Sequence, residues 1–155
     1  MILELFLVTL SVVGFGFVFE VPTKEIKFGA FVGLVTWLVY LLFVENLKAE
    51  SATLMGAMVG TYLARELTYC RKMPLTVFVL PGMLPLAPGY VLYKAMESTF
   101  LGSGEVGLYA MKAIKYAGAI GIGMGIALSL PSFIRYRMNK ANASNININI
   151  KKRRY

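Results

Sequence analysis

One long uncharged stretch of the chain, Met73–Tyr93, has unusual backbone chemistry, because three of its four prolines and both of its glycines lie close together. They are Pro81, Gly82, Pro85, Pro88 and Gly89. Proline has no backbone N–H, and in a helix its ring clashes with the carbonyl four residues earlier. An intact helix would therefore leave the carbonyls of Val77, Pro81 and Leu84 without their donors. We predict a kinked or broken helix, with a half-helix on each side of the motif.

A helix broken inside a lipid bilayer would offer backbone groups to a ligand. Unsatisfied backbone is costly in hydrocarbon, so such a break must lie within protein or beside a water-filled cavity. The second half-helix is expected to begin near Pro88. Its first amides, from Gly89, Tyr90 and Val91, would face an anionic group. The freed carbonyls upstream would accept hydrogen bonds from an ammonium group or coordinate a coupling cation. One interpretation is that the segment binds a zwitterionic amino acid. The alternative is a purely structural kink, which would have the same sequence pattern.

Arg65 is a second candidate, because a charged residue within an apolar segment is a functional candidate by default. It follows fourteen uncharged residues, 51–64. Three roles are open for it, namely binding a substrate carboxylate, pairing with Glu20, or reaching the lipid headgroups. We favour pairing or headgroup contact. The hydroxyls of Ser51, Thr53 and Tyr62 on the same segment could contact a substrate, but in such helices hydroxyls more often bond their own backbone.

The composition excludes several classes of function. The sequence has no His and a single cysteine, Cys70, so we expect no metal site, no disulfide within the chain and no His-based catalysis. It holds no Gly-rich phosphate loop and no nucleophile elbow, so we expect neither an enzyme nor a cofactor. The chain is 57% hydrophobic and 15% charged, whereas soluble domains are about half apolar and about a quarter charged. This balance favours a membrane protein.

Five apolar segments are predicted to form an all-α, integral membrane helix bundle. A bilayer core of about 30 Å needs about 20 mostly apolar residues per helix. The segments are Leu5–Phe19, Phe28–Val44, Ser51–Ala64, Met73–Tyr93 and Tyr116–Ile134. The first lacks the positive leader of a cleaved signal peptide, so we interpret it as a span. We expect a transmembrane domain over residues 1–136 and a basic, Asn/Ile-rich cytoplasmic tail over 137–155.

The basic residues indicate the orientation of the chain. With the C-terminus inside, twelve of the sixteen Lys and Arg residues lie on the inner side and four on the outer side. The positive-inside rule therefore predicts an N-out, C-in topology. The net charge of +8 sits in connectors and the tail, so we expect no nucleic-acid binding. The tail is expected to contact anionic headgroups of the lipid bilayer.

Small residues recur at the spacing that lets membrane helices approach closely. The G-x-x-x-G pairs are Gly29 with Gly33, Gly56 with Gly60, and Gly121 with Gly125. Close helix packing in lipid relies on such positions, because there is no hydrophobic drive between helices there. We interpret the pairs as packing within the bundle, with one glycine face available for docking a partner subunit or, in a homo-oligomer, another copy.

Three stretches together resemble a known family. They are Val13–Pro22, Ser51–Gly60 followed by Arg65, and Pro74–Phe78 leading into the proline-glycine motif and Tyr93. They look like the small membrane subunit (YjjB-like) of the threonine/serine exporter family, ThrE type. The resemblance extends over almost the whole chain to about Tyr136, and the proline-glycine stretch is its most specific part.

The resemblance implies that this chain is one subunit of a secondary-active exporter in the bacterial inner membrane. The implied substrates are threonine and serine, and the implied partner is a larger five-span subunit (YjjP-like). Export of dicarboxylates by the same two-subunit architecture is an alternative, as are a non-transporting membrane scaffold and a homo-oligomeric channel. The expected substrate-binding residues rest on the motif and on Arg65, not on the family. They are Pro81, Gly82, Pro85, Pro88, Gly89, Tyr90 and Arg65.

Overall fold

The structure is a computed structural model of the chain, and it describes residues 2–102 and 104–133. The described residues form helices and no strand, which confirms the predicted all-α class. The elements are α1 (Ile2–Val18), α2 (Thr23–Val44), α3 (Ala49–Arg71), α4 (Thr76–Met83), the 3₁₀ helix η1 (Leu84–Leu86), α5 (Gly89–Leu101) and α6 (Val106–Ser129). The predicted tail over residues 137–155 lies outside the described residues.

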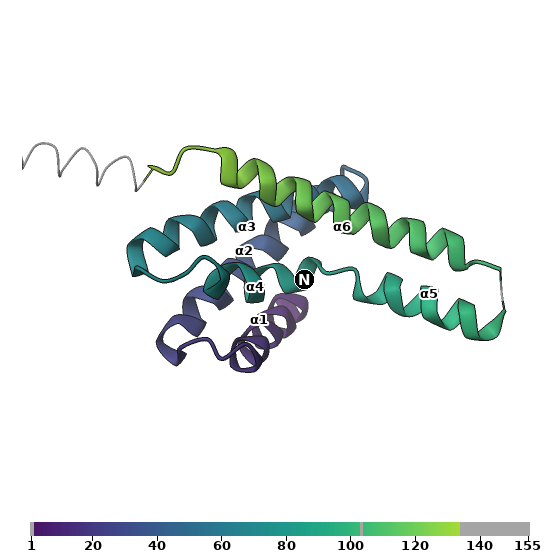
Figure 1. Ribbon diagram of the computed structural model, residues 1–155, viewed down its shortest axis with the longest axis horizontal. Helices are drawn as coiled ribbons and strands as arrows, with labels where there is room; N and C mark the ends of the chain where they lie inside the picture. The colour runs from purple at the N-terminus through teal and green to yellow at the C-terminus, as the bar shows by residue number, and fades with distance from the viewer. Residues whose placement is uncertain (1, 103, 134–155) are drawn as a thin grey trace, which may run out of the picture.

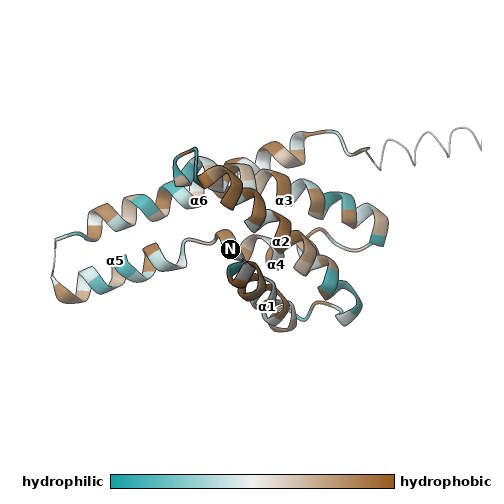
Figure 2. Ribbon diagram, turned by 180° about the vertical axis from the view of Figure 1, so that it is seen from behind, coloured by the Kyte–Doolittle hydropathy of each residue, from teal (hydrophilic) through white to brown (hydrophobic). Residues whose placement is uncertain are grey.

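Within the described residues, two helices are long and apolar enough to cross a membrane, with mean hydropathies of 1.9 for α2 and 1.2 for α6. A third span is possible if α4, η1 and α5 are counted as one bent crossing. The first and third predicted segments do form helices, α1 and α3. They fall short of this criterion because α1 has only 17 residues and α3 carries four charged ones. Apolar residues dominate α1 and α2, as Figure 2 shows.

Two of the predicted boundaries differ from the structure. The fourth apolar segment was expected to end at Tyr93, but α5 continues to Leu101. The fifth was expected to begin at Tyr116, but α6 begins at Val106 and ends at Ser129. The predicted boundaries were placed at charged residues, which here lie within the helices. The helices continue through them because Lys112 and Lys115 lie on the exposed face of α6.

The helix α2 is at the centre of the bundle, where it packs against α1, α3 and α4, while α3 also packs against α6. The core between them is formed by Val32, Ala57, Ala64, Phe78, Val79, Met83 and Leu86. The helix α5 packs mainly on α6, and the two form a hairpin that projects away from the other helices (Figure 1). The proline-glycine motif lies where this hairpin leaves the bundle.

Glycines make the central helix contacts possible. A Cβ atom on Gly33 would lie 2.6 Å from a methyl of Val12 in α1, and one on Gly56 would lie 3.1 Å from the carbonyl oxygen of Thr36 in α2. Two of the predicted glycine pairs, 29/33 and 56/60, therefore serve contacts within the chain. The third differs, because a Cβ on Gly121 or on Gly125 would meet open space.

An ion pair joins two connectors at one end of the bundle. The guanidinium of Arg71, at the end of α3, donates to both carboxylate oxygens of Glu25 at the start of α2, at 2.9 and 2.7 Å. Glu25 is buried, and Arg71 also lies over the ring of Phe28, 4.6 Å from its centroid. The α1–α2 and α3–α4 connectors, which carry the inner-side cations of the predicted topology, therefore lie together.

Candidate functional site

The helix is broken within the proline-glycine motif, as predicted. Helix α4 ends at Met83, η1 covers Leu84–Leu86, and α5 begins at Gly89. The two halves, Thr76–Leu86 and Gly89–Leu101, are bent by 56°. The helix persists through Pro81, and the break falls at Ala87 and Pro88. Extended backbone at Ala87 and the N-cap position of Pro88 separate the two halves.

Pro85 and Pro88 stand where a missing N–H is tolerated, whereas Pro81 lies inside α4. The carbonyl of Val77, which loses its helical donor to Pro81, faces Gly29 on α2. Pro85 is in the first turn of η1, where a helix has N–H groups without partners in any case. Pro88 is the N-cap residue of α5, where no helical hydrogen bond requires a backbone N–H. The motif therefore forms an ordered bend rather than a disrupted helix.

Pro81 and Gly82 are buried in the contact between α4 and α2. A Cβ on Gly29 would lie 3.4 Å from the Pro81 ring, and a Cβ on Gly82 would lie 2.6 Å from a methyl of Val32. These two residues bring α4 close to α2, and neither of them lines the cleft described next.

A cleft of about 310 Å³ opens at the break, within the range of about 300–1,000 Å³ typical of ligand sites. It is lined by residues of the break and by side chains from α2, α3, α5 and α6. They are Trp37, Tyr40, Thr53, Pro85, Leu86, Ala87, Pro88, Tyr90, Val91 and Tyr116. Three of the predicted site residues, Pro85, Pro88 and Tyr90, therefore lie together in one cleft.

The N-terminus of α5 lies at this cleft. The amide of Gly89 donates to the carbonyl of Ala87 at 2.8 Å, and the amide of Leu92 donates to that of Pro88 at 3.0 Å. No side chain caps the helix. The first-turn amides of Tyr90 and Val91 are therefore the donors that this end presents, together with the positive end of the helix dipole. An anionic group is the ligand that such an end favours.

Aromatic rings and uncharged polar groups form the rest of the lining. The rings of Trp37 and Tyr40 lie 4.9 Å apart between centroids, and their planes are tilted by 30°. The indole Nε1 of Trp37 is buried and has no hydrogen-bond partner in the described part of the chain. The Thr53 hydroxyl donates to the carbonyl of Ala49 at 2.8 Å, so it bonds its own backbone, as such hydroxyls commonly do.

Sequence reasoning missed Trp37, Tyr40 and Tyr116, although each is an aromatic residue with a polar atom inside an apolar segment. That signal alone does not separate a ligand site from ordinary packing. Trp37 and Tyr40 come from α2 and Tyr116 comes from α6. Which side chains of these helices face the break depends on tertiary contacts.

Arg65 lies away from the cleft, at the C-terminal end of α6. Its Nη1 donates to the carbonyls of Ala127 and Leu128, at 3.1 and 3.0 Å, and to that of Leu130. The last carbonyls of a helix lack intrahelical donors, and a cation there also favours the negative end of the helix dipole. Arg65 thus fixes the end of α6 to α3.

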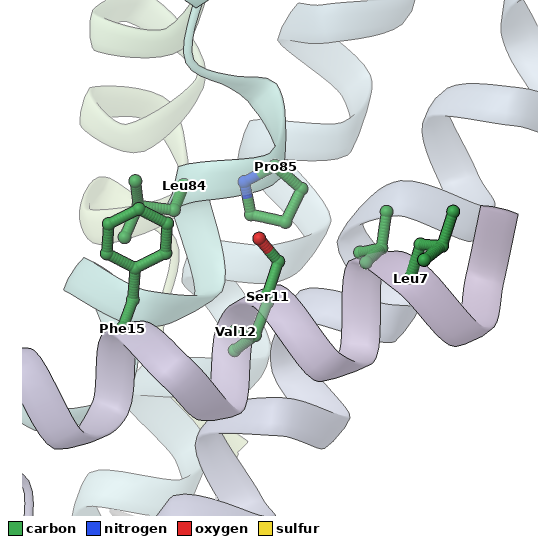
Figure 3. A pocket seen from close by; sticks show the side chains of 7 residues that line it. Leu7, Ser11, Val12, Phe15, Leu84 and Pro85 are labelled. Carbon is green, nitrogen blue, oxygen red and sulfur yellow. The ribbon is translucent and has the colours of Figure 1, made fainter.

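A second, smaller hollow of about 220 Å³ lies on the other side of η1, between η1 and α1. Figure 3 shows Phe15 lying beside Leu84, and the hydroxyl of Ser11 pointing toward Pro85. Apart from Ser11, its lining side chains are apolar. Because Pro85 lines both hollows, η1 separates them. The few polar groups in this hollow make it the weaker candidate for a polar ligand.

The described residues contain no group of three or more His, Cys, Asp or Glu side chains that could hold a metal ion. A sequence profile described as "Threonine/Serine exporter, ThrE" matches residues 4–130, which is most of the chain. No solved structure matches this chain.

Proposed function

Since the chain belongs to the threonine/serine exporter (ThrE) family, we propose that it is a subunit of a secondary-active exporter whose substrates are threonine and serine. The observation that carries the proposal is the cleft at the broken helix, where the uncapped start of α5 meets a ligand-sized space. The exporter acts together with a larger membrane subunit, in the bacterial inner membrane.

In this proposal the substrate carboxylate binds the first-turn amides of α5. Pro85 and Pro88 keep the backbone bent, so that the amides of Tyr90 and Val91 stay exposed to the cleft. Gly89 is the first residue of the second half-helix, α5. The protein supplies binding and positioning only, and export is driven by a gradient of ions across the membrane.

The remaining predicted site residues have supporting roles. Pro81 and Gly82 hold α4 against α2, and Arg65 holds α6 against α3. Because the cleft is lined from α2, α3 and α6, these contacts set the distances between its walls. We assign all three as positioning residues.

The proposed topology is N-out and C-in. The ion pair between buried Glu25 and exposed Arg71 lies where the α1–α2 and α3–α4 connectors meet at one end of the bundle. Arg65 brings the C-terminus of α6 to the same α3 helix. The positive-inside rule supports assigning the end with these cations to the cytoplasm.

The larger subunit is proposed to dock on the outer face of α6. Gly118, Gly121 and Gly125 present a face there on which an added Cβ meets open space, whereas the central glycines already serve contacts within the chain. Small residues on one helix let a second membrane helix approach closely. The exposed apolar side chains of the α5–α6 hairpin, among them Phe100 and Met111, extend this surface.

The test measures threonine efflux from bacterial cells preloaded with a threonine-containing dipeptide. The cells express this chain, the larger subunit, both, or neither. We expect faster efflux only when both chains are present. No change with both chains well expressed would remove threonine as the substrate, and efflux of a dicarboxylate instead would favour the alternative family activity.

The same cells test the docking face. Gly121→Leu is expected to reduce both efflux and copurification of the larger subunit, because the bulky side chain prevents close helix approach. Gly14→Leu is the matched control, since a Cβ on this α1 glycine also meets open space. Equal copurification by both variants would place the partner elsewhere.

A further inference from the structure

Among the residues that the structure describes, none that lines the cleft carries a charged side chain. An amino acid carries an ammonium group as well as a carboxylate, and the start of α5 can satisfy only the carboxylate. Burying an ammonium group without a partner is strongly unfavourable. The cleft must therefore supply some other feature that favours a cation.

The carbonyls freed by the prolines do not supply it. Val77, Pro81 and Leu84 all lie outside the cleft lining. The carbonyl of Val77 faces Gly29 on α2, and that of Leu84 accepts the amide of Ala87 at 3.0 Å. The carbonyls of Val77 and Leu84, which sequence reasoning assigned to the ammonium group, are therefore turned toward other parts of the chain.

Aromatic side chains are the feature that remains. Four of them, from three helices, line the cleft, namely Trp37 and Tyr40 of α2, Tyr90 of α5 and Tyr116 of α6. A ring face is electronegative and attracts a cation within about 6 Å of its centroid, most strongly when the cation is desolvated. Sites that recognise quaternary ammonium groups use several rings around one space, and the same ring-face attraction acts on any ammonium cation.

We propose that Trp37, Tyr40, Tyr90 and Tyr116 form an aromatic cage that binds the ammonium group of the exported amino acid. This assignment rests on the proposed function. The cage and the start of α5 lie in the same cleft, so they bind the two charged groups of one zwitterion.

The cage also selects the class of substrate. A dicarboxylate would place its second carboxylate among ring faces that repel anions, with no Lys or Arg in the lining to compensate. A monocarboxylate with an ammonium group fits both ends of the cleft. The site therefore selects amino acids over dicarboxylates of similar size.

The experiment measures the threonine concentration that half-saturates transport by the two-subunit complex in inside-out membrane vesicles. Tyr40→Phe keeps the ring face and removes the hydroxyl, whereas Tyr40→Leu removes the ring. We expect Tyr40→Phe to stay within about twofold of the unmodified complex and Tyr40→Leu to raise the half-saturating concentration about tenfold. Tyr116→Phe and Tyr116→Leu are expected to repeat this split.

Two controls make the result specific to the ammonium group. Tyr93→Leu alters an exposed α5 aromatic that is outside the cleft lining, and it is expected to change nothing. The second control is competition by 3-hydroxybutyrate, which resembles threonine without its ammonium group. It should compete weakly with threonine for the unmodified complex, and Tyr40→Leu should not weaken that competition further. The copurified partner shows that each variant still assembles.

Several results would overturn the cage. One is an unchanged half-saturating concentration in both Leu variants. Another is an equal loss in the Phe and Leu variants, which would assign the effect to the hydroxyl. A complex that moves no threonine at all would reject the exporter proposal and the cage with it, whereas threonine transport unaffected by loss of the rings would reject the cage alone.

Discussion

Individual glycines in the broken segment have opposite structural roles, although they look alike in the sequence. Gly82 is buried against Val32, where a Cβ would lie 2.6 Å from a fully buried methyl-bearing side chain. Gly89 is exposed, and a Cβ there meets open space. The first glycine is required by packing, while the second is required by neither packing nor a positive φ.

This difference gives a prediction about stability. Gly82→Ala is expected to destabilise the protein by roughly 1–3 kcal/mol, because Val32 cannot move aside without disturbing the core. Gly89→Ala is expected to change stability by less than about 1 kcal/mol. Thermal unfolding in detergent measures both. Equal Tm values for the two variants would mean that α4 does not pack on α2 as described.

The sequence predicts which residues are unusual but not what each of them contacts. The prolines alone indicate a break, and the structure has one. That α4 needs a glycine at Gly82 depends on Val32, a residue on another helix and far away in the sequence. The aromatic lining escapes prediction for the same reason, because Trp37 and Tyr116 line one cleft only after α2 and α6 have each packed against α3.

At the scale of elements, the end of α6 depends on one side chain of α3. Arg65 satisfies carbonyls at Ala127, Leu128 and Leu130, which a helix C-terminus otherwise leaves without donors. The sequence left three roles open for this arginine. The observed contacts favour a role in positioning α6, and hence Tyr116 on the cleft wall.

Replacement of Arg65 distinguishes positioning from substrate binding. Arg65→Ala is expected to lower stability by roughly 1.5–3 kcal/mol through lost charge-assisted hydrogen bonds, and to speed hydrogen exchange at the end of α6. The half-saturating threonine concentration should stay within about threefold, since Arg65 lies outside the cleft lining. A large rise in that concentration with unchanged exchange would instead assign Arg65 to the substrate carboxylate.

At the scale of the whole molecule, the surface is that of a membrane protein. Large apolar side chains are exposed along α1, α2, α5 and α6. The orientation that the charge pattern indicates depends on the connectors, which are local in the sequence, and it stays a prediction. The number of helices long enough to span was harder to predict, since a helix can be short, like α1, or carry charges, like α3.

The whole account depends on the bend at Pro88 and Gly89, where two half-helices create one cleft. Replacing Pro88 restores an N–H that can bond to the carbonyl of Leu84, so the double variant Pro88→Ala, Gly89→Ala favours a continuous helix. The added methyl at Gly89 meets open space, so assembly with the larger subunit should be preserved.

Threonine efflux from cells that express both subunits, with and without this double substitution, tests the central claim most directly. Immunoblotting of the membrane fraction confirms that the chain is present, and copurification confirms that it is assembled. We predict that efflux falls to the level of cells without the exporter while assembly is retained. Normal efflux from the double variant would contradict the claim that the broken helix forms the substrate site.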